Sequence, residues 1–187
     1  NHEGKIVASS ELTDEDMTDI GSAIPKFTYG ITLNLEYKGF DFTAFGTGVA
    51  GNKIFNILYR ADSPLRNSLK YYMDNAWTPE NKGASMPAVN NVATDLNFWS
   101  SSAAMFNGSY FKIKQLQLGY TLPKRLTQKV AIKDLRFFVS LDDFFTFSNY
   151  PGMDPETATT GNNGGAGFDI GSYPTMKKCS FGASFSF

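Results

Sequence analysis

The stretch that decides the fold is residues 27–37, which read Phe-Thr-Tyr-Gly-Ile-Thr-Leu-Asn-Leu-Glu-Tyr. Every odd position carries a large apolar side chain, and every even position carries Thr, Gly, Asn or Glu. Because successive side chains of a β-strand point to opposite faces, this alternation predicts a strand with one apolar and one polar face. Residues 178–187 repeat the pattern, with Cys179, Phe181, Phe185 and Phe187 on the apolar face.

Three further strands are predicted between these two. The second strand follows the first after only Lys38 and Gly39, a two-residue connection typical of a β-hairpin. The segments between strands are expected to form turns and loops, with a short helix within residues 65–76. The five predicted strands are residues 27–37, 40–48, 109–122, 134–147 and 175–187.

The connections between the strands differ greatly in length. Those at 38–39 and 123–134 are short, and the second carries Lys124, Arg125, Lys129 and Lys133. Those at 49–108 and 148–174 are long, and counting strands in order places both long connections at one end. Short turns at one end, long loops at the other and two-faced strands are typical of an outer-membrane β-barrel. Aromatic side chains at the short-turn end fit an interfacial girdle: Tyr37, Phe40, Tyr120 and Phe187.

Composition excludes several other classes. The 187 residues carry a net charge of −1, without the basic excess that nucleic-acid binding needs. Lone Cys179 and lone His2 argue against an internal disulfide framework, a Cys-rich zinc site and a His-based catalytic triad. No run approaches the ~18 apolar residues of a membrane helix. With no evident base to activate Ser or Thr, an enzyme is not expected.

A soluble, secreted β-sandwich that binds carbohydrate through Trp77 and neighbouring aromatics is the alternative, because sandwich strands also alternate. A sandwich would turn many Lys and Glu side chains to water, whereas the polar faces here are mostly Ser, Thr, Gly and Asn. An all-β membrane barrel is therefore favoured. Five strands cannot close such a barrel, for which ~8 is the smallest bacterial count, so the chain is expected to be part of a larger one.

An ordered series of motifs resembles SusC/RagA-type TonB-dependent transporters of Bacteroidetes. Residues 20–30 resemble the entry to a late strand of that family, and 108–114 with 118–123 resemble a later pair of strand motifs. The quoted segments are IGSAIPKFTYG at 20–30, YKGFD at 37–41, WTPEN at 77–81, GSYFKIK at 108–114, LGYTLP at 118–123, GMDPE at 152–156, GSYPT at 171–175 and FGASFSF at 181–187.

The resemblance implies the C-terminal part of a 22-stranded barrel, here its last five or so strands. Residues 1–26 would end an extracellular loop, and residues 27–187 would form barrel, with extracellular loops at 49–108 and 148–174. It implies a plug, the rest of the barrel, outer-membrane lipid, a SusD-like surface lipoprotein as a lid, and TonB acting through an N-terminal region absent here. The cargo would be oligosaccharides or peptides, and the location the outer membrane of a Gram-negative bacterium.

Residues 1–6 resemble an EF-hand-like calcium loop of the family, although its first Asp would precede Asn1 and residues 7–12 look inserted. Calcium is the one cofactor that this resemblance implies, and a polar extracellular turn is the alternative reading. Oxygen ligands at alternating positions suit Ca²⁺. The candidate ligands are Asn1, Glu3, the Lys5 carbonyl and Asp16.

Three other groups of side chains are candidates for contact with partners. The polar positions of the first strand, Thr28, Thr32, Asn34 and Glu36, would face the lumen and plug. Aromatic side chains of the long loop could contact a lid or ligand or pack the loop itself: Tyr71, Tyr72, Trp77 and Trp99. The terminal Phe185 and Phe187 resemble the signal read by the outer-membrane insertion machinery, and an interfacial anchor is the simpler role.

Overall fold

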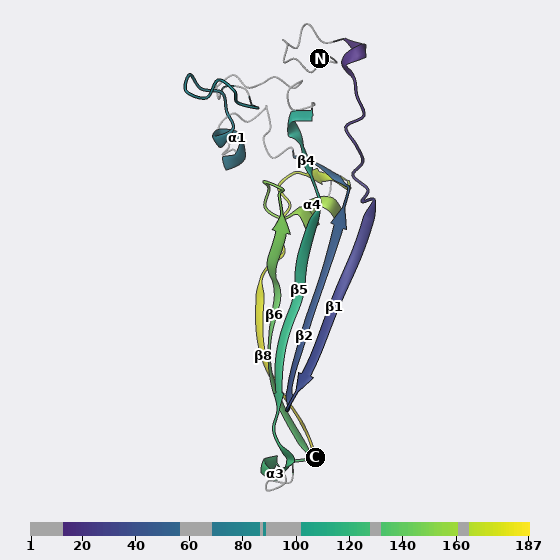
Figure 1. The fold of residues 1–187 in the computed structure, drawn as a ribbon, viewed down its shortest axis with the longest axis vertical. Coiled ribbons are helices and arrows are strands. Elements are labelled where there is room, and N and C mark those ends of the chain that lie inside the picture. Colours follow the sequence, from purple (N-terminus) through teal and green to yellow (C-terminus); the bar gives the residue numbers. More distant parts are fainter. Residues whose placement is uncertain (1–12, 57–68, 87, 89–101, 128–131, 161–164) are drawn as a thin grey trace. The chain divides into compact units, whose positions relative to one another are not determined.

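The computed structural model describes residues 13–56, 69–86, 88, 102–127, 132–160 and 165–187 (Figure 1). Contacts along the chain divide it into two compact units. The strand unit consists of Lys26–Ala50, Ser109–Ser148 and Pro174–Phe187. The loop unit consists of Asn1–Pro25, Gly51–Gly108 and Asn149–Tyr173.

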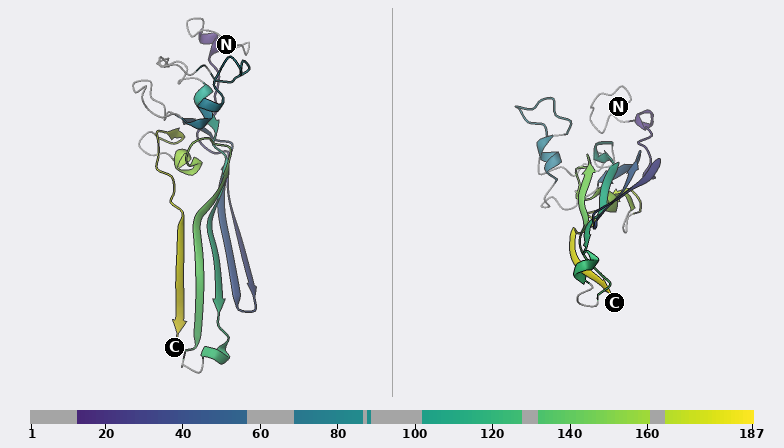
Figure 2. Two further views of the ribbon diagram at one scale, coloured as in Figure 1. Left: turned by 90° about the vertical axis from the view of Figure 1, so that its left-hand side faces the viewer. Right: turned by 60° about the horizontal axis from the view of Figure 1, so that its bottom comes forward.

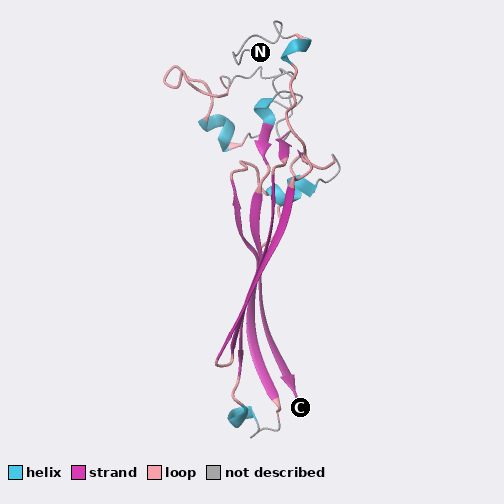
Figure 3. Ribbon diagram, turned by 45° about the vertical axis from the view of Figure 1, so that its right-hand side comes forward, coloured by secondary structure: helices cyan, strands magenta, loops and turns pink. Residues whose placement is uncertain are grey.

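The described part of the strand unit holds a five-stranded antiparallel sheet in the order β1-β2-β5-β6-β8. Its strands lie side by side in the left view of Figure 2, and Figure 3 shows the twist that adjacent strands normally adopt. The short helix α3 (Lys124–Thr127) follows β5. The strands are β1 (Phe27–Tyr37), β2 (Phe40–Ala50), β5 (Tyr110–Thr121), β6 (Asp134–Ser148) and β8 (Lys178–Ser186).

The β1–β2 turn consists of Lys38 and Gly39, both of which have positive φ, at 47° and 85°. Two positive φ angles give a turn whose twist matches that of the flanking strands. Glycine accepts this conformation freely, while Lys38 holds it at some steric cost. The Gly39 carbonyl accepts a 2.7 Å hydrogen bond from the Thr121 amide, which ties the hairpin to the end of β5.

The regular register of the sheet is interrupted once, at the same level on two strand pairs. Between β2 and β5 the pairing shifts after Phe45, and between β5 and β6 it shifts at Ile113–Gln115. Asp143 in this region has φ 58°, and its carboxylate lies 2.6 Å from the Lys114 ammonium. The ion pair therefore lies at an irregularity that bends the strands and increases their local twist.

The loop unit is more ordered than the sequence predicted. Where turns and loops were expected, three short strands form a second sheet in the order β4-β3-β7, with β3 and β7 parallel. The expected short helix within residues 65–76 is α1. The elements are η2 (Asp14–Asp16), β3 (Lys53–Asn56), α1 (Lys70–Asp74), η3 (Ser102–Ala104), β4 (Met105–Asn107), α4 (Pro155–Thr160) and β7 (Phe168–Asp169).

Among the described residues, no helix has the length and apolar character needed to cross a membrane. The prediction of an all-β chain with five two-faced antiparallel strands is confirmed. The five strands form an open sheet, with β1 and β8 at its edges.

Candidate functional site

The strand register brings the apolar positions of all five strands onto one face. Leu35 pairs with Phe42, Phe42 with Leu118, Leu118 with Val139 and Val139 with Phe181. These side chains are not a core, since Leu35 is 54% exposed and Phe181 is 83% exposed. A sandwich buries its apolar face against a second sheet. The exposed face contradicts the sandwich alternative and suits a sheet whose solvent is lipid.

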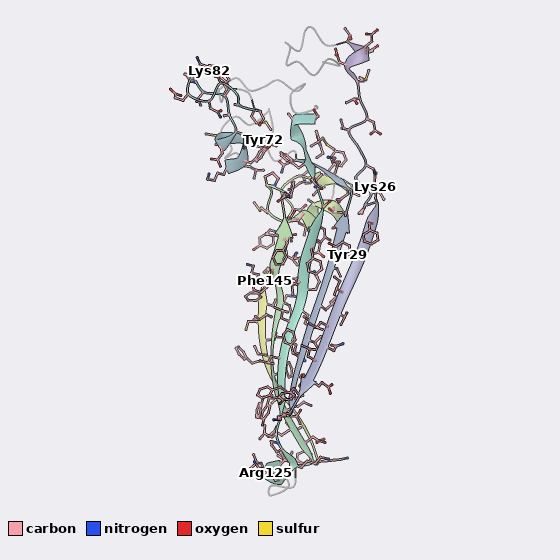
Figure 4. All side chains as sticks on the ribbon, in the orientation of Figure 1. Lys26, Tyr29, Tyr72, Lys82, Arg125 and Phe145 are labelled. Atoms are coloured by element: carbon pink, nitrogen blue, oxygen red, sulfur yellow. The ribbon has the colours of Figure 1, made fainter. Side chains whose placement is uncertain are left out.

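An aromatic band crosses the apolar face near the start of β1. The Tyr29 ring, labelled in Figure 4, stacks on Phe27 at 5.6 Å and on Phe111 at 5.9 Å between centroids, and Phe111 stacks on Phe147 at 6.4 Å. Tyr29 lies over Gly48, where an added Cβ would come within 2.5 Å of the ring. The missing side chain at Gly48 therefore makes room for the stack to continue from β1 across β2.

A second aromatic group lies at the tight-turn end. Phe40 and Tyr120 pair at 4.5 Å between ring centroids, and the Lys38 ammonium lies 5.1 Å from the Tyr37 ring. Phe27 and Tyr37 are ten residues apart on β1. At ~3.3 Å per residue and a strand tilt of ~40°, this separation gives roughly 25 Å along a membrane normal. That height equals the apolar band of an outer-membrane barrel.

Polar side chains occupy the opposite face of the sheet, including all four predicted lumen-facing residues of β1. The Thr43 hydroxyl donates to Asn34 Oδ1 at 2.9 Å, and Glu36 lies directly across from Asp41. An open hollow of about 820 Å³ lies at the tight-turn end of the sheet, beside Lys38 and Gly39. The side chains that give it a polar character are Asn34, Glu36, Asp41, Thr43, Gln117 and Arg136.

Arg136 is a residue of this face that sequence reasoning did not single out. Its Nε donates to Asp41 Oδ2 at 2.9 Å, and its Nη2 contacts Asp41 Oδ1, so β6 reaches across β5 to β2. The guanidinium crosses over Gly119, where an added Cβ would lie 2.4 Å from both partners. A larger side chain at this position would have to displace the pair in its present geometry, and glycine leaves the path open. The pair also offsets the like charges of Glu36 and Asp41.

A buried lysine lies on β5, near the end of the strand that is farther from the tight turn. Lys112 is 2% exposed, and its ammonium donates to Thr175 Oγ1 at 2.5 Å. Because Thr175 precedes β8, this contact joins the approach to the last strand to β5. The neighbouring carboxylates are also engaged: Ser140 Oγ donates to Asp142 Oδ1 at 2.8 Å, and Asp143 pairs with Lys114.

The loop unit contains a buried aromatic and polar cluster of its own. The Tyr150 hydroxyl donates to Asp169 Oδ2 at 2.5 Å and accepts from Asn56 Nδ2 at 2.8 Å. The Gly171 amide donates to the other Asp169 oxygen at 3.0 Å. Phe106 contacts Tyr150 at 6.1 Å between centroids. Burial, together with the Asp169 carboxylate, raises the pKa of the Tyr150 phenol.

Two of the predicted loop aromatics, Tyr71 and Tyr72, join this cluster. Both rings pack edge-on against Phe106, with centroids at 5.2 and 6.1 Å, and Figure 4 labels Tyr72 on α1. Tyr72 is only 6% exposed, and its burial raises the pKa of its phenol. Internal packing is therefore the role that the structure gives Tyr72.

Trp77 is different, since 44% of it is exposed. It follows the bridge between Ala76 and Met86, and its amide donates to the Met86 carbonyl at 3.0 Å, which fixes the backbone beneath the indole. Among the three described members of the predicted aromatic group, Trp77 is therefore the exposed one. Trp99 lies outside the described residues.

Of the predicted calcium ligands, Asn1, Glu3 and Lys5 lie outside the described residues. Asp16 is described, and its Oδ2 accepts from the Thr13 amide at 2.8 Å and from the Thr13 hydroxyl at 3.3 Å. Across the part of the chain that the structure describes, no cluster of three or more His, Cys, Asp or Glu side chains could hold a metal. The calcium site stays a prediction.

The terminal aromatics lie at the tight-turn end of β8. Phe185 is on the apolar face opposite Leu135, and its ring contacts that of Phe187 at 5.6 Å. They are 61% and 84% exposed. Cys179 is a free, exposed thiol on the same face, opposite Leu141.

No family model matches the chain. TonB-dependent receptor P3 of Formosa agariphila is 33% identical over 187 residues, covering 96% of this chain and 18% of the receptor. The chain is part of a TonB-dependent receptor. TonB-dependent receptor P26 of the same organism is 25% identical over 182 residues, covering 94% of this chain and 18% of that protein. The segment thus spans less than a fifth of either relative's length.

Solved structures agree on the fold of this receptor segment. The RagAB peptide importer in its "closed-closed" state matches 100% of this chain and 20% of its own, with a TM-score of 0.70 and 24% identity. The "open-open" state matches 88% of this chain and 17% of its own, with a TM-score of 0.61 and 24% identity. All of these proteins are named as receptors or importers rather than enzymes.

Proposed function

We propose that the chain forms part of the wall of a receptor that imports nutrient molecules across the outer membrane of a Gram-negative bacterium. The observation that carries this proposal is the exposed apolar face of the sheet, bounded by aromatic groups whose separation along the strands matches a lipid bilayer's apolar band. The names of the relatives support the same function.

The polar face would line the barrel lumen. Thr28, Thr32, Asn34 and Glu36 would face the plug, and the Asp41–Arg136 pair and Lys112 would be part of the same wall. Small hydroxyl and amide side chains suit this role because they tolerate both water and a neighbouring domain that fills the lumen. Two ion pairs within the sheet, Asp41 with Arg136 and Asp143 with Lys114, would offset part of the charge of that wall.

The cargo would be an oligosaccharide or a peptide, and a SusD-like lipoprotein would close the barrel from outside while TonB supplies energy. The loops at 49–108 and 148–174 would face that lipoprotein. Support comes from the family and from the likeness to the RagAB peptide importer in several states. The exposed indole of Trp77 would contribute to the contact with the lid.

The import test compares uptake in cells that express or lack the full-length receptor. Fluorescent oligosaccharides and fluorescent peptides are supplied separately, and strains lacking TonB or the neighbouring SusD-like lipoprotein serve as controls. Loss of uptake of one cargo class in all three deletion strains is the expected result. Unchanged uptake of both classes in the receptor deletion strain, with the receptor still located in the outer membrane of the parent strain, would contradict import as its function.

The lid contact is tested by co-purification of the SusD-like lipoprotein with the full-length receptor. Trp77→Ala should lower the recovered lipoprotein several-fold. Tyr173→Ala is a matched control, because Tyr173 is also an aromatic residue of the loop unit and is 76% exposed. Equal recovery with both variants would remove Trp77 from the lid contact.

The calcium site is tested with radioactive calcium on the chelator-treated full-length receptor. Asp16→Asn should reduce binding, whereas Asp74→Asn, which alters an exposed carboxylate paired with Lys70, should not. Calcium binding that is equal in both variants would place the ion elsewhere, and no binding at all would leave residues 1–16 as a polar turn.

The insertion role of Phe185 and Phe187 is tested by the amount of folded receptor in the outer membrane. Phe187→Ala should reduce the amount of inserted receptor, while Phe181→Ala, which alters an equally exposed aromatic of β8, should have a smaller effect. If both variants reduced the amount of inserted receptor equally, Phe187 would act only as an interfacial anchor.

A further inference from the structure

The tight-turn end of the sheet carries a concentration of cations in a chain whose net charge is −1. Lys38 occupies the β1–β2 turn, Lys124 and Arg125 begin α3, and Lys133 precedes β6. All four side chains are exposed. Within the described residues none of the four forms an ion pair, in contrast to Arg136 and Lys114 on the strands. This set is called the basic turn patch.

Backbone hydrogen bonds hold the patch at one end of the sheet. The Gly39 carbonyl accepts from the Thr121 amide, the Leu135 carbonyl accepts from the Leu122 amide at 2.9 Å, and the Lys133 amide donates to the Ser186 carbonyl at 2.8 Å. The patch is therefore tied to β5, β6 and β8 at their common end. Figure 4 labels Arg125 in α3, beyond the end of β5.

The patch begins where the aromatic group of the tight-turn end stops. Lys38 is next to Tyr37 and contacts its ring, and Lys124 comes four residues after Tyr120. Aromatic rings of a membrane protein lie at the level of the lipid headgroups. The four cations are therefore placed at, or just beyond, the headgroups of the leaflet on this side.

Apolar side chains accompany the cations. Leu126 is 51% exposed and Phe187 is 84% exposed, although water is an unfavourable solvent for both apolar side chains. Cations next to exposed apolar side chains suit the boundary between headgroups and acyl chains, where the stem of a lysine or arginine lies along apolar groups and its charge reaches the phosphates. Arg125 adds a planar guanidinium, which binds phosphate oxygens in pairs.

We infer that the basic turn patch binds anionic phospholipid headgroups of the leaflet on the tight-turn side. The nearest carboxylates belong to strands rather than to the turns: Glu36 and Asp41 lie across from each other on β1 and β2, and Asp134 begins β6. Asp41 is paired with Arg136 on the polar face, and Asp134 accepts a 3.4 Å hydrogen bond from Ser186. The site recognises the net negative charge of the headgroup and does not require a specific headgroup.

The test uses the full-length receptor in detergent, with native mass spectrometry to measure bound phosphatidylglycerol against phosphatidylcholine. The variant is K124Q/R125Q/K133Q. The control variant is K53Q/K70Q/K82Q, which removes the same charge from exposed lysines of the loop unit. Heat-modifiable migration on a denaturing gel shows that each variant retains its folded barrel.

The native receptor should prefer phosphatidylglycerol, and the patch variant should lose affinity by roughly fivefold per neutralised cation, since each contributes about 1 kcal/mol near an anionic surface. The control should keep its affinity. Inorganic phosphate at the same concentration should not displace the lipid, which distinguishes a headgroup site from a free-phosphate site.

Equal binding of the two lipids by the native receptor, or equal affinity in the patch and control variants, would overturn the inference. So would binding of an acidic peptide to the patch with no preference between lipids, because the partner would then be a protein. Cargo uptake is measured separately in the same variants. A failure of lipid binding is therefore distinguishable from a failure of the import proposal.

Discussion

The strand unit and the loop unit place similar side chains in opposite surroundings. The strand unit exposes its apolar residues, with Phe27 62% and Phe181 83% accessible, and turns its polar residues to the other face. The loop unit buries Ile54 and Ala158 completely and adds a polar network around Tyr150. The two units are therefore adapted to two solvents, with lipid outside the strands and water around the loops.

The largest loss of stability is expected when a charge is placed on the lipid-facing side of the sheet. Leu33→Arg, near the middle of β1, should destabilise the full-length receptor by about 2–4 kcal/mol, because a cation at the centre of the bilayer loses its water. Denaturant unfolding of the receptor in lipid vesicles measures the change. Thr32→Arg, one residue away on the polar face, should cost much less. Equal costs would contradict the assignment of the two faces.

In the loop unit, the corresponding change is the loss of a buried hydroxyl. Tyr150→Phe leaves Asn56 and Asp169 each without one partner, and a buried polar group that loses its hydrogen bond costs about 1–3 kcal/mol. Amide hydrogen exchange across α4 and β7 should therefore accelerate while exchange in the strand unit does not. Tyr173→Phe, at an exposed site, should leave amide exchange unchanged in the loop unit and in the strand unit. Faster exchange throughout the sheet would show that the units are not independent.

The same cluster predicts a pH dependence confined to the loop unit. Because the pKa of Tyr150 is raised above its ordinary value of 10.0, the unfolded segment loses its phenolic proton before the folded one. The stabilisation is therefore complete below pH 10 and declines as pH rises above it. A tyrosinate absorbance titration of the native receptor minus Tyr150→Phe should show a component above pH 10. A difference component at or below that value would contradict a buried, neutral phenol.

The smallest effect is expected on the polar face. Asp41 and Arg136 side chains are each about a quarter exposed, so their coupling in a cycle of Asp41→Asn and Arg136→Gln should be about 1 kcal/mol or less. Gly119→Ala should remove that coupling, because its Cβ would occupy the path of the guanidinium. A coupling unchanged by Gly119→Ala would mean that the pair does not need the glycine.

Sequence reasoning was most effective where the pattern has a fixed period. The alternation over residues 27–37 predicted β1 and both of its faces, because a buried or lipid-facing side of a strand leaves a period of two in the sequence. The motifs then gave the family. Both signals are local or follow chain order, so neither requires knowledge of which strands are neighbours.

What sequence reasoning missed depends on contacts between distant residues. Asp41 and Arg136 are 95 positions apart, and their pairing follows only from the register across β5. The second sheet was missed because β3, β4 and β7 are too short to show a period. Asn56, Tyr150 and Asp169 likewise come from three separate segments. Asn56 and Asp169 are polar residues in segments predicted as loops, and nothing in the sequence pattern indicated that they are buried.

The membrane-spanning arrangement of the sheet is tested most directly by a cysteine scan of residues 27–37 in the full-length receptor, after Cys179 and every other native cysteine have been replaced by alanine. Each cysteine carries a fluorophore, and quenching by a lipid-phase quencher is compared with quenching by a water-soluble one. We expect lipid-phase quenching at odd positions and aqueous quenching at even positions, alternating from Phe27 to Tyr37. Quenching without this alternation, or aqueous quenching at the odd positions, would contradict the sheet as a membrane-spanning wall.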